Sequence, residues 1–263
     1  MSVQAKKSLG QNFLHSKGVV NTMLDAGAID SHDIVVEAGP GKGILTQELL
    51  SCARQVIAIE KDPRLIFFLS LKFKKEITEG KLKLIQGDIL AFDPASENLK
   101  PSGYKVVSNI PYYLTGQFLR YFLSHITPPS CLVLLLQKEV VQRIVARDGK
   151  ESILSIAVKV YGTPRYVDKV SAKLFNPRPR VDSAILLISN ISKKFFTTVD
   201  ERRFFEILRL GFSQKRKMLL GNLSSIAPRE RLVDIFKDLD IPEKARAENL
   251  APSKWKGLVL AIK

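Results

Sequence analysis

Residues Asn109-Ile110-Pro111-Tyr112 bring two hydrogen-bond acceptors and an aromatic ring to the end of a short apolar segment. Asn109 offers a side-chain oxygen, and the Ile110 carbonyl has a set direction because the proline after it restricts the backbone. The Tyr112 ring offers a flat face for a base. This combination suits an amino group on a heteroaromatic ring. The simpler alternatives are a helix cap for Asn109 and an ordinary core position for Tyr112.

A second set of residues has the spacing of a nucleoside site. Gly39, Gly41 and Gly43 separate an apolar run from a helical run, and glycines there permit a sharp turn and the close approach of a ligand. Glu60 follows Gly39 by 21 residues and ends the next apolar run, and Asp88 ends the one after it. Carboxylates at such positions accept hydrogen bonds from ribose hydroxyls and from an adenine amino group. The glycine spacing is not the dinucleotide fingerprint, and it lacks the lysine-hydroxyl pair of a phosphate loop.

The elements that would position these residues alternate along the first two thirds of the chain. The apolar runs that predict strands are 33–39, 55–62, 81–88, 104–109 and 131–137, and the helical patterns between them are 44–53, 62–77 and 115–126. Asp62 and Pro63 have the types expected at a helix N-cap and first turn. Apolar strands separated by helices predict an α/β fold with a mainly parallel sheet. The candidate residues then meet at the carboxyl ends of the strands.

The pattern changes after residue 150. Residues 152–162 alternate in hydrophobicity and 182–189 form another apolar run, which predicts an antiparallel pair that closes the sheet. Beyond residue 190 the strand signals end, and amphipathic helical patterns occupy 202–223 and 228–239. We therefore predict a catalytic domain over 1–189 and a small all-α domain over 190–263.

Charge favours a polyanionic partner. The chain has 263 residues with 41 Lys and Arg against 26 Asp and Glu, and residues 190–263 alone carry 16 against 9. Such an excess is typical of nucleic-acid binding, although a basic enzyme without that role is the alternative. Lys215, Arg216 and Lys217 are the candidate phosphate contacts, and a solvated helix face is the alternative for them.

Cysteine and histidine give no sign of a metal or disulfide site. The two cysteines and three histidines are scattered without ligand spacing. The N-terminus lacks the apolar segment of a signal peptide, and the longest aliphatic run, 132–136, is too short to cross a membrane. We expect a cytoplasmic protein that needs no metal.

The chain resembles the KsgA-type ribosomal RNA adenine dimethyltransferases over nearly its whole length. Eight segments carry the resemblance, in the order seen in the family: "KKSLGQNFL" (6–14), "EAGPGKGILT" (37–46), "IEKD" (59–62), "GD" (87–88), "NIPYYLT" (109–115), "LQKEVVQRI" (136–144), "LFNPRPRVDSAI" (174–185) and "FSQKRKMLLGNL" (212–223). One position and one segment depart from the family pattern. Ala38 stands where isoleucine is usual, and 146–158 lacks the usual glycine-tyrosine-glycine pattern.

The resemblance implies a Rossmann-like class I methyltransferase fold with a seven-stranded sheet and S-adenosyl-L-methionine (AdoMet) as methyl donor. The implied acceptors are the N6 amines of two adjacent adenosines near the 3′ end of small-subunit (16S) ribosomal RNA, dimethylated by a monomer acting on a subunit assembly intermediate. The implied cofactor contacts are Gln11, Asn12, Leu14, Gly39, Gly41, Glu60, Asp88 and Asn109. The implied residues at the target base are Asn109, Ile110, Pro111, Tyr112 and Phe175, with Phe175 packed opposite Tyr112.

Two other functions remain possible on the sequence alone. One is a relative that dimethylates large-subunit ribosomal RNA and confers antibiotic resistance, although "LGQNFL" and "GPGKG" look more like the KsgA branch. The other is an RNA-binding or transcription-factor-like relative that keeps the fold without the activity, against which the intact Glu60, Asp88 and "NIPY" (109–112) argue.

Overall fold

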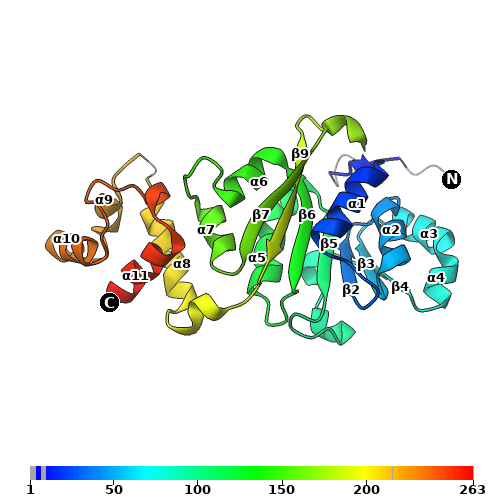
Figure 1. Ribbon diagram of the computed structural model, residues 1–263, viewed down its shortest axis with the longest axis horizontal. Coiled ribbons are helices and arrows are strands. Elements are labelled where there is room, and N and C mark those ends of the chain that lie inside the picture. Colours follow the sequence, from blue (N-terminus) through cyan, green and yellow to red (C-terminus); the bar gives the residue numbers. More distant parts are fainter. Residues whose placement is uncertain (1–3, 7–9, 215, 263) are drawn as a thin grey trace. The chain divides into compact units, whose positions relative to one another are not determined.

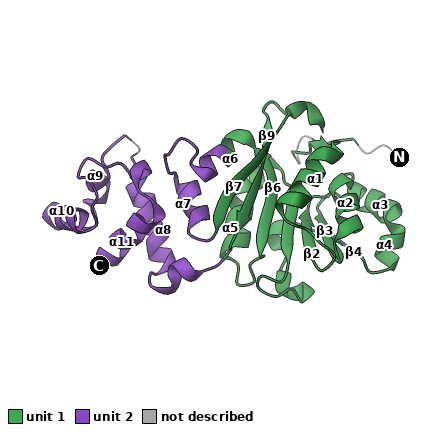
Figure 2. Cartoon of the chain, in the orientation of Figure 1, with its two compact units in different colours: residues 1–141, 162–191 green, residues 142–161, 192–263 purple. Residues whose placement is uncertain are grey.

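The computed structural model describes residues 4–6, 10–214 and 216–262, so Lys215 lies outside the described residues. The chain divides into two compact units, which Figure 2 shows in different colours. Unit 1 comprises Met1–Val141 and Gly162–Ile191, and unit 2 comprises 142–161 with 192–263. The division therefore groups 142–161 with the C-terminal helices, whereas the sequence pattern predicts a single boundary near residue 190.

Unit 1 is built on a seven-stranded sheet with strand order β4-β3-β2-β5-β6-β9-β7 (Figure 1). Its strands are β2 (Ile34–Ala38), β3 (Gln55–Glu60), β4 (Leu82–Gln86), β5 (Lys105–Asn109), β6 (Cys131–Gln137), β7 (Thr163–Val170) and β9 (Ser183–Ser189). Only β9 runs antiparallel to its neighbours, β6 and β7. This confirms the predicted mainly parallel sheet with an antiparallel closing strand.

Helices and a small second sheet complete unit 1. The helices are α1 (Lys17–Ala26), α2 (Ile44–Cys52), α3 (Pro63–Lys72), α4 (Lys74–Thr78), α5 (Thr115–Ser124) and α6 (Lys138–Val145), the last of which continues into unit 2. Strand β1 (Phe13–Leu14) pairs antiparallel with β8 (Phe175–Asn176). Met23, Leu49 and Leu69 of α1, α2 and α3 share one buried cluster with Val35 and Val133 of the sheet. Burial of these apolar side chains fixes the helices on the sheet.

The predicted strand over 152–162 is wrong, because this segment contains helix α7 (Ile153–Lys159). Ser152 caps the helix, and its hydroxyl and that of Ser155 form a reciprocal capping box. Alternating apolar residues in so short a run fit a helix as well as a strand. The strand beside β9 is β7, which the pattern missed because it is an edge strand with many polar residues.

Unit 2 is helical throughout the part that the structure describes, as predicted for the C-terminal domain. Its further helices are α8 (Glu201–Gly211), α9 (Leu219–Leu223), α10 (Arg229–Asp238) and α11 (Pro252–Ala261). The helical pattern over 202–223 is interrupted after Gly211, where Phe212 stacks on Trp255 with ring centroids 5.7 Å apart. The described helices include none that is long and apolar enough to cross a membrane.

Gly211 provides a test of the packing in unit 2. A methyl group on its α-carbon would lie 2.3 Å from Trp255 Cη2 and 2.9 Å from Leu219 Cδ1. We expect Gly211→Ala to lower the free energy of unfolding by about 1–3 kcal/mol, because overpacking outweighs the better helix propensity of alanine. Denaturant unfolding followed by the fluorescence of Trp255, the single tryptophan, measures the change.

Gly221→Ala in α9 is the matched control. Its new methyl group would meet no atom within 4 Å. We therefore expect no loss, or a gain of up to about 1 kcal/mol from helix propensity. Equal effects of the two substitutions would contradict the packing argument.

Candidate active site

A pocket of about 230 Å³ lies in unit 1 at the carboxyl ends of β2, β3, β4 and β5. It brings together eleven of the residues that the sequence analysis predicts as cofactor or target-base contacts: Gln11, Asn12, Leu14, Gly39, Gly41, Glu60, Asp88, Asn109, Ile110, Pro111 and Tyr112. They come from five separate segments of the chain. Four of these segments meet there because the carboxyl ends of adjacent parallel strands form one edge, and the segment that contains β1 (Phe13–Leu14) is the fifth.

Phe175 is not brought to this pocket. It lies in β8 opposite Leu14 of β1 and is only 3% exposed. Its side chain belongs to the buried cluster that also contains Val170 and Ile185. Phe175 is therefore part of the buried core in this structure, and its packing opposite Tyr112 on a target base stays a prediction.

The glycine turn needs glycine for two physical reasons. Gly41 has φ +58°, in the left-handed region, and a Cβ atom there would lie 3.0 Å from the Phe13 ring. Gly43 has φ +74°, and its Cβ atom would lie 2.6 Å from the Phe73 ring. Without side chains at these two positions, the turn packs tightly between α3 and the N-terminal segment. The backbone of the turn can then line the pocket.

Glu60 presents a nearly buried carboxylate to the pocket. It is 6% exposed, its Oε2 accepts from the Gly41 amide at 3.3 Å, and its Oε1 accepts from the Asp62 amide at 2.9 Å. Burial raises the pKa of Glu60 above its usual range, against the effect of these amides. Each oxygen retains a lone pair, so a vicinal diol can donate one hydroxyl to each.

Asp88 is held by two donors at the rim of the pocket. Its Oδ1 accepts from the Leu90 amide at 3.0 Å, and its Oδ2 lies 2.9 Å from Lys61 Nζ. These two donors hold the pKa of Asp88 below its usual range. Lys61 is largely exposed, and such pairs are weak. A ligand amine can therefore share Oδ2 with Lys61 or displace it.

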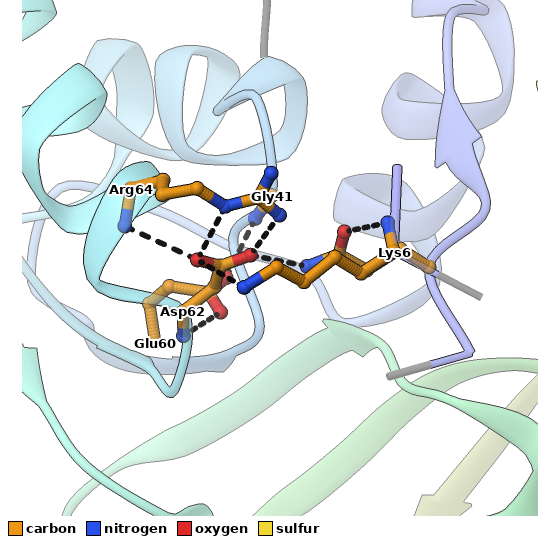
Figure 3. Close-up of polar contacts among 6 residues, drawn as sticks. Lys6, Gly41, Glu60, Asp62 and Arg64 are labelled. Carbon is orange, nitrogen blue, oxygen red and sulfur yellow. Dashed lines mark hydrogen bonds and ion pairs between the residues drawn. The ribbon is translucent and has the colours of Figure 1, made fainter. Parts of the chain in front are cut away.

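Asp62 ties the N-terminal segment to the pocket (Figure 3). It is 1% exposed and accepts from the Arg64 guanidinium at 2.6 Å and from Gln11 Nε2 at 3.2 Å, and Lys6 Nζ lies 3.9 Å away. The bonds from Arg64 lower the pKa of Asp62 to about 2. Its capping of α3 confirms the sequence prediction. Its contact with Gln11 was missed, because a cap motif says nothing about a partner 51 residues away.

The segment from Asn109 to Tyr112 forms a polar wall of the pocket. Asn109 Nδ2 donates to the Asn12 carbonyl at 3.3 Å, and α5 begins only at Thr115, so Asn109 does not cap that helix. Tyr112 is half-buried and lines the pocket. Its position is therefore not that of an ordinary core aromatic.

Glu37 lines the pocket but was not predicted from the sequence. It precedes the glycine turn in β2, is 1% exposed, and its Oε2 has no hydrogen-bond partner among the described residues. Burial raises its pKa to about 8, against the lowering effect of the neighbouring Thr46 hydroxyl and amide. The sequence signal was a carboxylate just before Gly39, but an acid inside an apolar run does not by itself reveal which way it points.

Comparison with known proteins finds similarity along nearly the whole chain. A family model described as ribosomal RNA adenine dimethylase matches residues 2–263. Among curated proteins, the "Ribosomal RNA small subunit methyltransferase A" of Dehalococcoides mccartyi is 38% identical over 98% of this chain and 89% of that protein. The protein of the same name from Fusobacterium nucleatum is 33% identical over 98% of both.

Two crystal structures resemble the chain over most of its length. A dimethyladenosine transferase from Plasmodium falciparum has a TM-score of 0.80 and 29% identity, over 94% of this chain and 96% of that one. The 23S rRNA methyltransferase ErmE has a TM-score of 0.77 and 25% identity, over 95% of this chain and 99% of that one.

The buried Glu37 should make stability depend on pH. Its pKa is about 8 in the folded protein against an ordinary value of 4.5. Between these values the folded state binds a proton that the unfolded state has lost. The free energy of unfolding should therefore fall as the pH rises from 5 to 8, by at most about 1.4 kcal/mol per pH unit. Glu37→Gln should make this fall smaller in denaturant unfolding measured at each pH, and the raised pKa of Glu60 accounts for a fall that remains.

Glu79→Gln is the control for this experiment, because the Glu79 side chain is 54% exposed. It should keep the pH dependence of the wild type. If Glu37→Gln also keeps it, Glu37 does not remain protonated in the folded protein.

Proposed function

The chain belongs to the ribosomal RNA adenine dimethylase family, and we propose that it dimethylates N6 of two adjacent adenosines near the 3′ end of small-subunit (16S) ribosomal RNA. Membership makes it an AdoMet-dependent methyltransferase of ribosomal RNA adenines with a Rossmann-like fold. The observation that carries the proposal is the convergence of Glu60, Asp88 and Asn109 on one pocket. The small-subunit target is supported by full-length relatives of 33–38% identity that are named for that subunit.

The residues of the pocket fit AdoMet as the methyl donor. When bound, AdoMet supplies an electrophilic methyl group on a positively charged sulfur. Glu60 would accept from the two ribose hydroxyls, and Asp88 would accept from the adenine amine beside Lys61. Glu37 Oε2, which has no partner in the described part of the chain, is available to an ammonium group, and such a partner would favour the ionised form of this carboxylate.

Asn109 and the Ile110 carbonyl hold the target amine in this proposal. Since Asn109 Nδ2 donates to the Asn12 carbonyl, its Oδ1 is left to accept from one N–H of adenine N6. The Ile110 carbonyl, directed by Pro111, accepts from the other. Holding both N–H groups out of the ring plane takes the nitrogen lone pair out of conjugation with the ring. The nitrogen then becomes nucleophilic. The contribution of these residues is orientation and electrostatic preorganisation.

The same two acceptors account for dimethylation. After the first methyl transfer one N–H remains, so one acceptor still orients the nitrogen for the second. Tyr112 stacks on the adenine ring, which offsets part of the cost of taking the base out of the RNA stack.

Unit 2 supplies RNA affinity in this proposal. Residues 190–263 carry the denser positive charge, and Arg216 and Lys217 are exposed in the loop between α8 and α9. Lys215 would add a third cation from outside the described residues. We propose that this loop binds RNA phosphates, and that the protein acts as a cytoplasmic monomer on a small-subunit assembly intermediate.

The central experiment is methylation of small ribosomal subunits that lack dimethyladenosine, followed by nucleoside mass spectrometry and mapping of the modified adenines. We expect dimethyladenosine as the end product, with monomethyladenosine in transit. Asn109→Ala should lower turnover by about 10²–10³, the usual effect of losing one preorganised polar group. AdoMet affinity, measured by calorimetry, should fall less. Wild-type turnover by Asn109→Ala would refute the two-acceptor mechanism, and methylation of large subunits alone would refute the proposed target.

The loop between α8 and α9 can be tested through salt dependence. Arg216→Gln with Lys217→Gln should flatten the dependence of RNA affinity on salt by about 0.7–0.9 units of slope for each phosphate that is no longer neutralised. Neutralising the exposed Lys74 and Lys75 of α4 removes the same charge from unit 1 and should change the slope less. Equal slopes for both pairs would make the loop an ordinary solvated surface.

A further inference from the structure

A buried serine holds the aromatic ring that lines the pocket. The hydroxyls of Tyr112 and Ser183 lie 2.8 Å apart, although 71 residues separate them in the chain. Ser183 is the first residue of β9 and is fully buried. Its sequence context and the family resemblance assign it no role.

The antiparallel direction of β9 explains this meeting. Ser183 pairs with Gln137, the last residue of β6, while Asn109, the last residue of β5, pairs with Leu135. Parallel strands bring their last residues to the pocket edge, whereas the antiparallel β9 brings its first. Ser183 therefore lies at the same edge of the sheet as Tyr112, although its strand runs in the opposite direction.

Ser183 is held in the sheet from both sides. It is paired on one side with Gln137 and on the other with Val170. The residue before it, Asp182, accepts from the Lys138 amide at 3.0 Å through its carbonyl. A hydroxyl on a strand paired on both sides has little freedom to move, so it can hold a partner in one place.

Tyr112 is consequently held at both ends. Its backbone lies in a 3₁₀ turn (Tyr112–Leu114) after Pro111, and its carbonyl accepts from Thr115 Oγ1 at 2.9 Å. Its hydroxyl is bonded to Ser183. Burial raises the pKa of Tyr112 above its usual range, so the phenol keeps the proton that it can donate. The ring between these two anchors lines the pocket.

We propose that Ser183 is a positioning residue for target-base recognition, and that it acts by fixing the position and direction of the Tyr112 ring in the pocket. This inference rests on the proposed function. A ring fixed before the base arrives does not have to be ordered on binding, so the stack forms at lower entropic cost. The benefit should therefore lie in capture of the RNA and not in AdoMet binding.

The test compares Ser183→Ala, Tyr112→Phe and the double variant in methylation of small ribosomal subunits at saturating AdoMet. Tyr112→Phe keeps the ring and removes only the hydroxyl. Each single variant should lower kcat/KM about two- to tenfold, the usual worth of one hydrogen bond, and mainly through KM for the subunit. The double variant should be no worse than the poorer single one, because both substitutions remove the same bond.

Ser189→Ala, at the other end of β9, is the matched control and should leave kcat/KM unchanged. AdoMet affinity and thermal unfolding are measured for every variant. A purely structural role for Ser183 predicts lower thermal stability with an unchanged KM, and that result overturns the proposal. So does a double variant whose loss equals the product of the two single losses.

The outcomes also separate this inference from the proposed function. If Ser183→Ala does not fold, Tyr112→Phe decides alone, and a wild-type KM for it overturns the proposal. Absence of dimethylation by the wild type refutes the proposed function and this inference together. Normal wild-type turnover with no loss in Ser183→Ala or Tyr112→Phe refutes this inference only.

Discussion

The carboxyl ends of adjacent parallel strands lie side by side, and the pocket depends on this constraint. Strands β3 and β5 end in Glu60 and Asn109, β2 ends one residue after Glu37, and the loop after β4 adds Asp88. None of these residues meets another through nearness in the chain. The hydrogen-bond ladder of the sheet sets their spacing, and the buried side chains beneath it keep the ladder in register.

Three acidic residues near the glycine turn have different roles because their burial and their hydrogen-bond partners differ. Asp62 is buried but bonded to Arg64 and Gln11, so it remains ionised and anchors the N-terminal segment. Glu60 is buried with backbone amides as partners, which leaves lone pairs for a ligand. Glu37 has an oxygen without a partner among the residues that the structure describes, and its charged form is disfavoured. Desolvation alone raises a carboxyl pKa, and hydrogen bonds to the charged form oppose it.

The single antiparallel strand adds what a purely parallel sheet could not. Because β9 starts where β6 ends, it brings Ser183 to the pocket edge and closes the contact with Tyr112. The small sheet of β1 and β8 likewise fixes the N-terminal segment, because Leu14 pairs with Phe175. That pairing accounts for the burial of Phe175 in the core. Both contacts join residues that are far apart in the sequence, so both depend on the completed fold.

The sequence by itself determined the parallel strands, the helices between them and the residues at the strand ends, because hydrophobic period and turn residues are local signals. It also determined the helical character of the C-terminal part. It failed at α7, where an alternating run suits either structure until the Ser152 cap is considered. Only the tertiary structure decided that Glu37 faces the pocket, that Asp62 holds Gln11, that Ser183 meets Tyr112 and that Phe175 is buried. Burial and partner choice across 50 or more residues depend on how strands pair and pack, and no local pattern encodes that geometry.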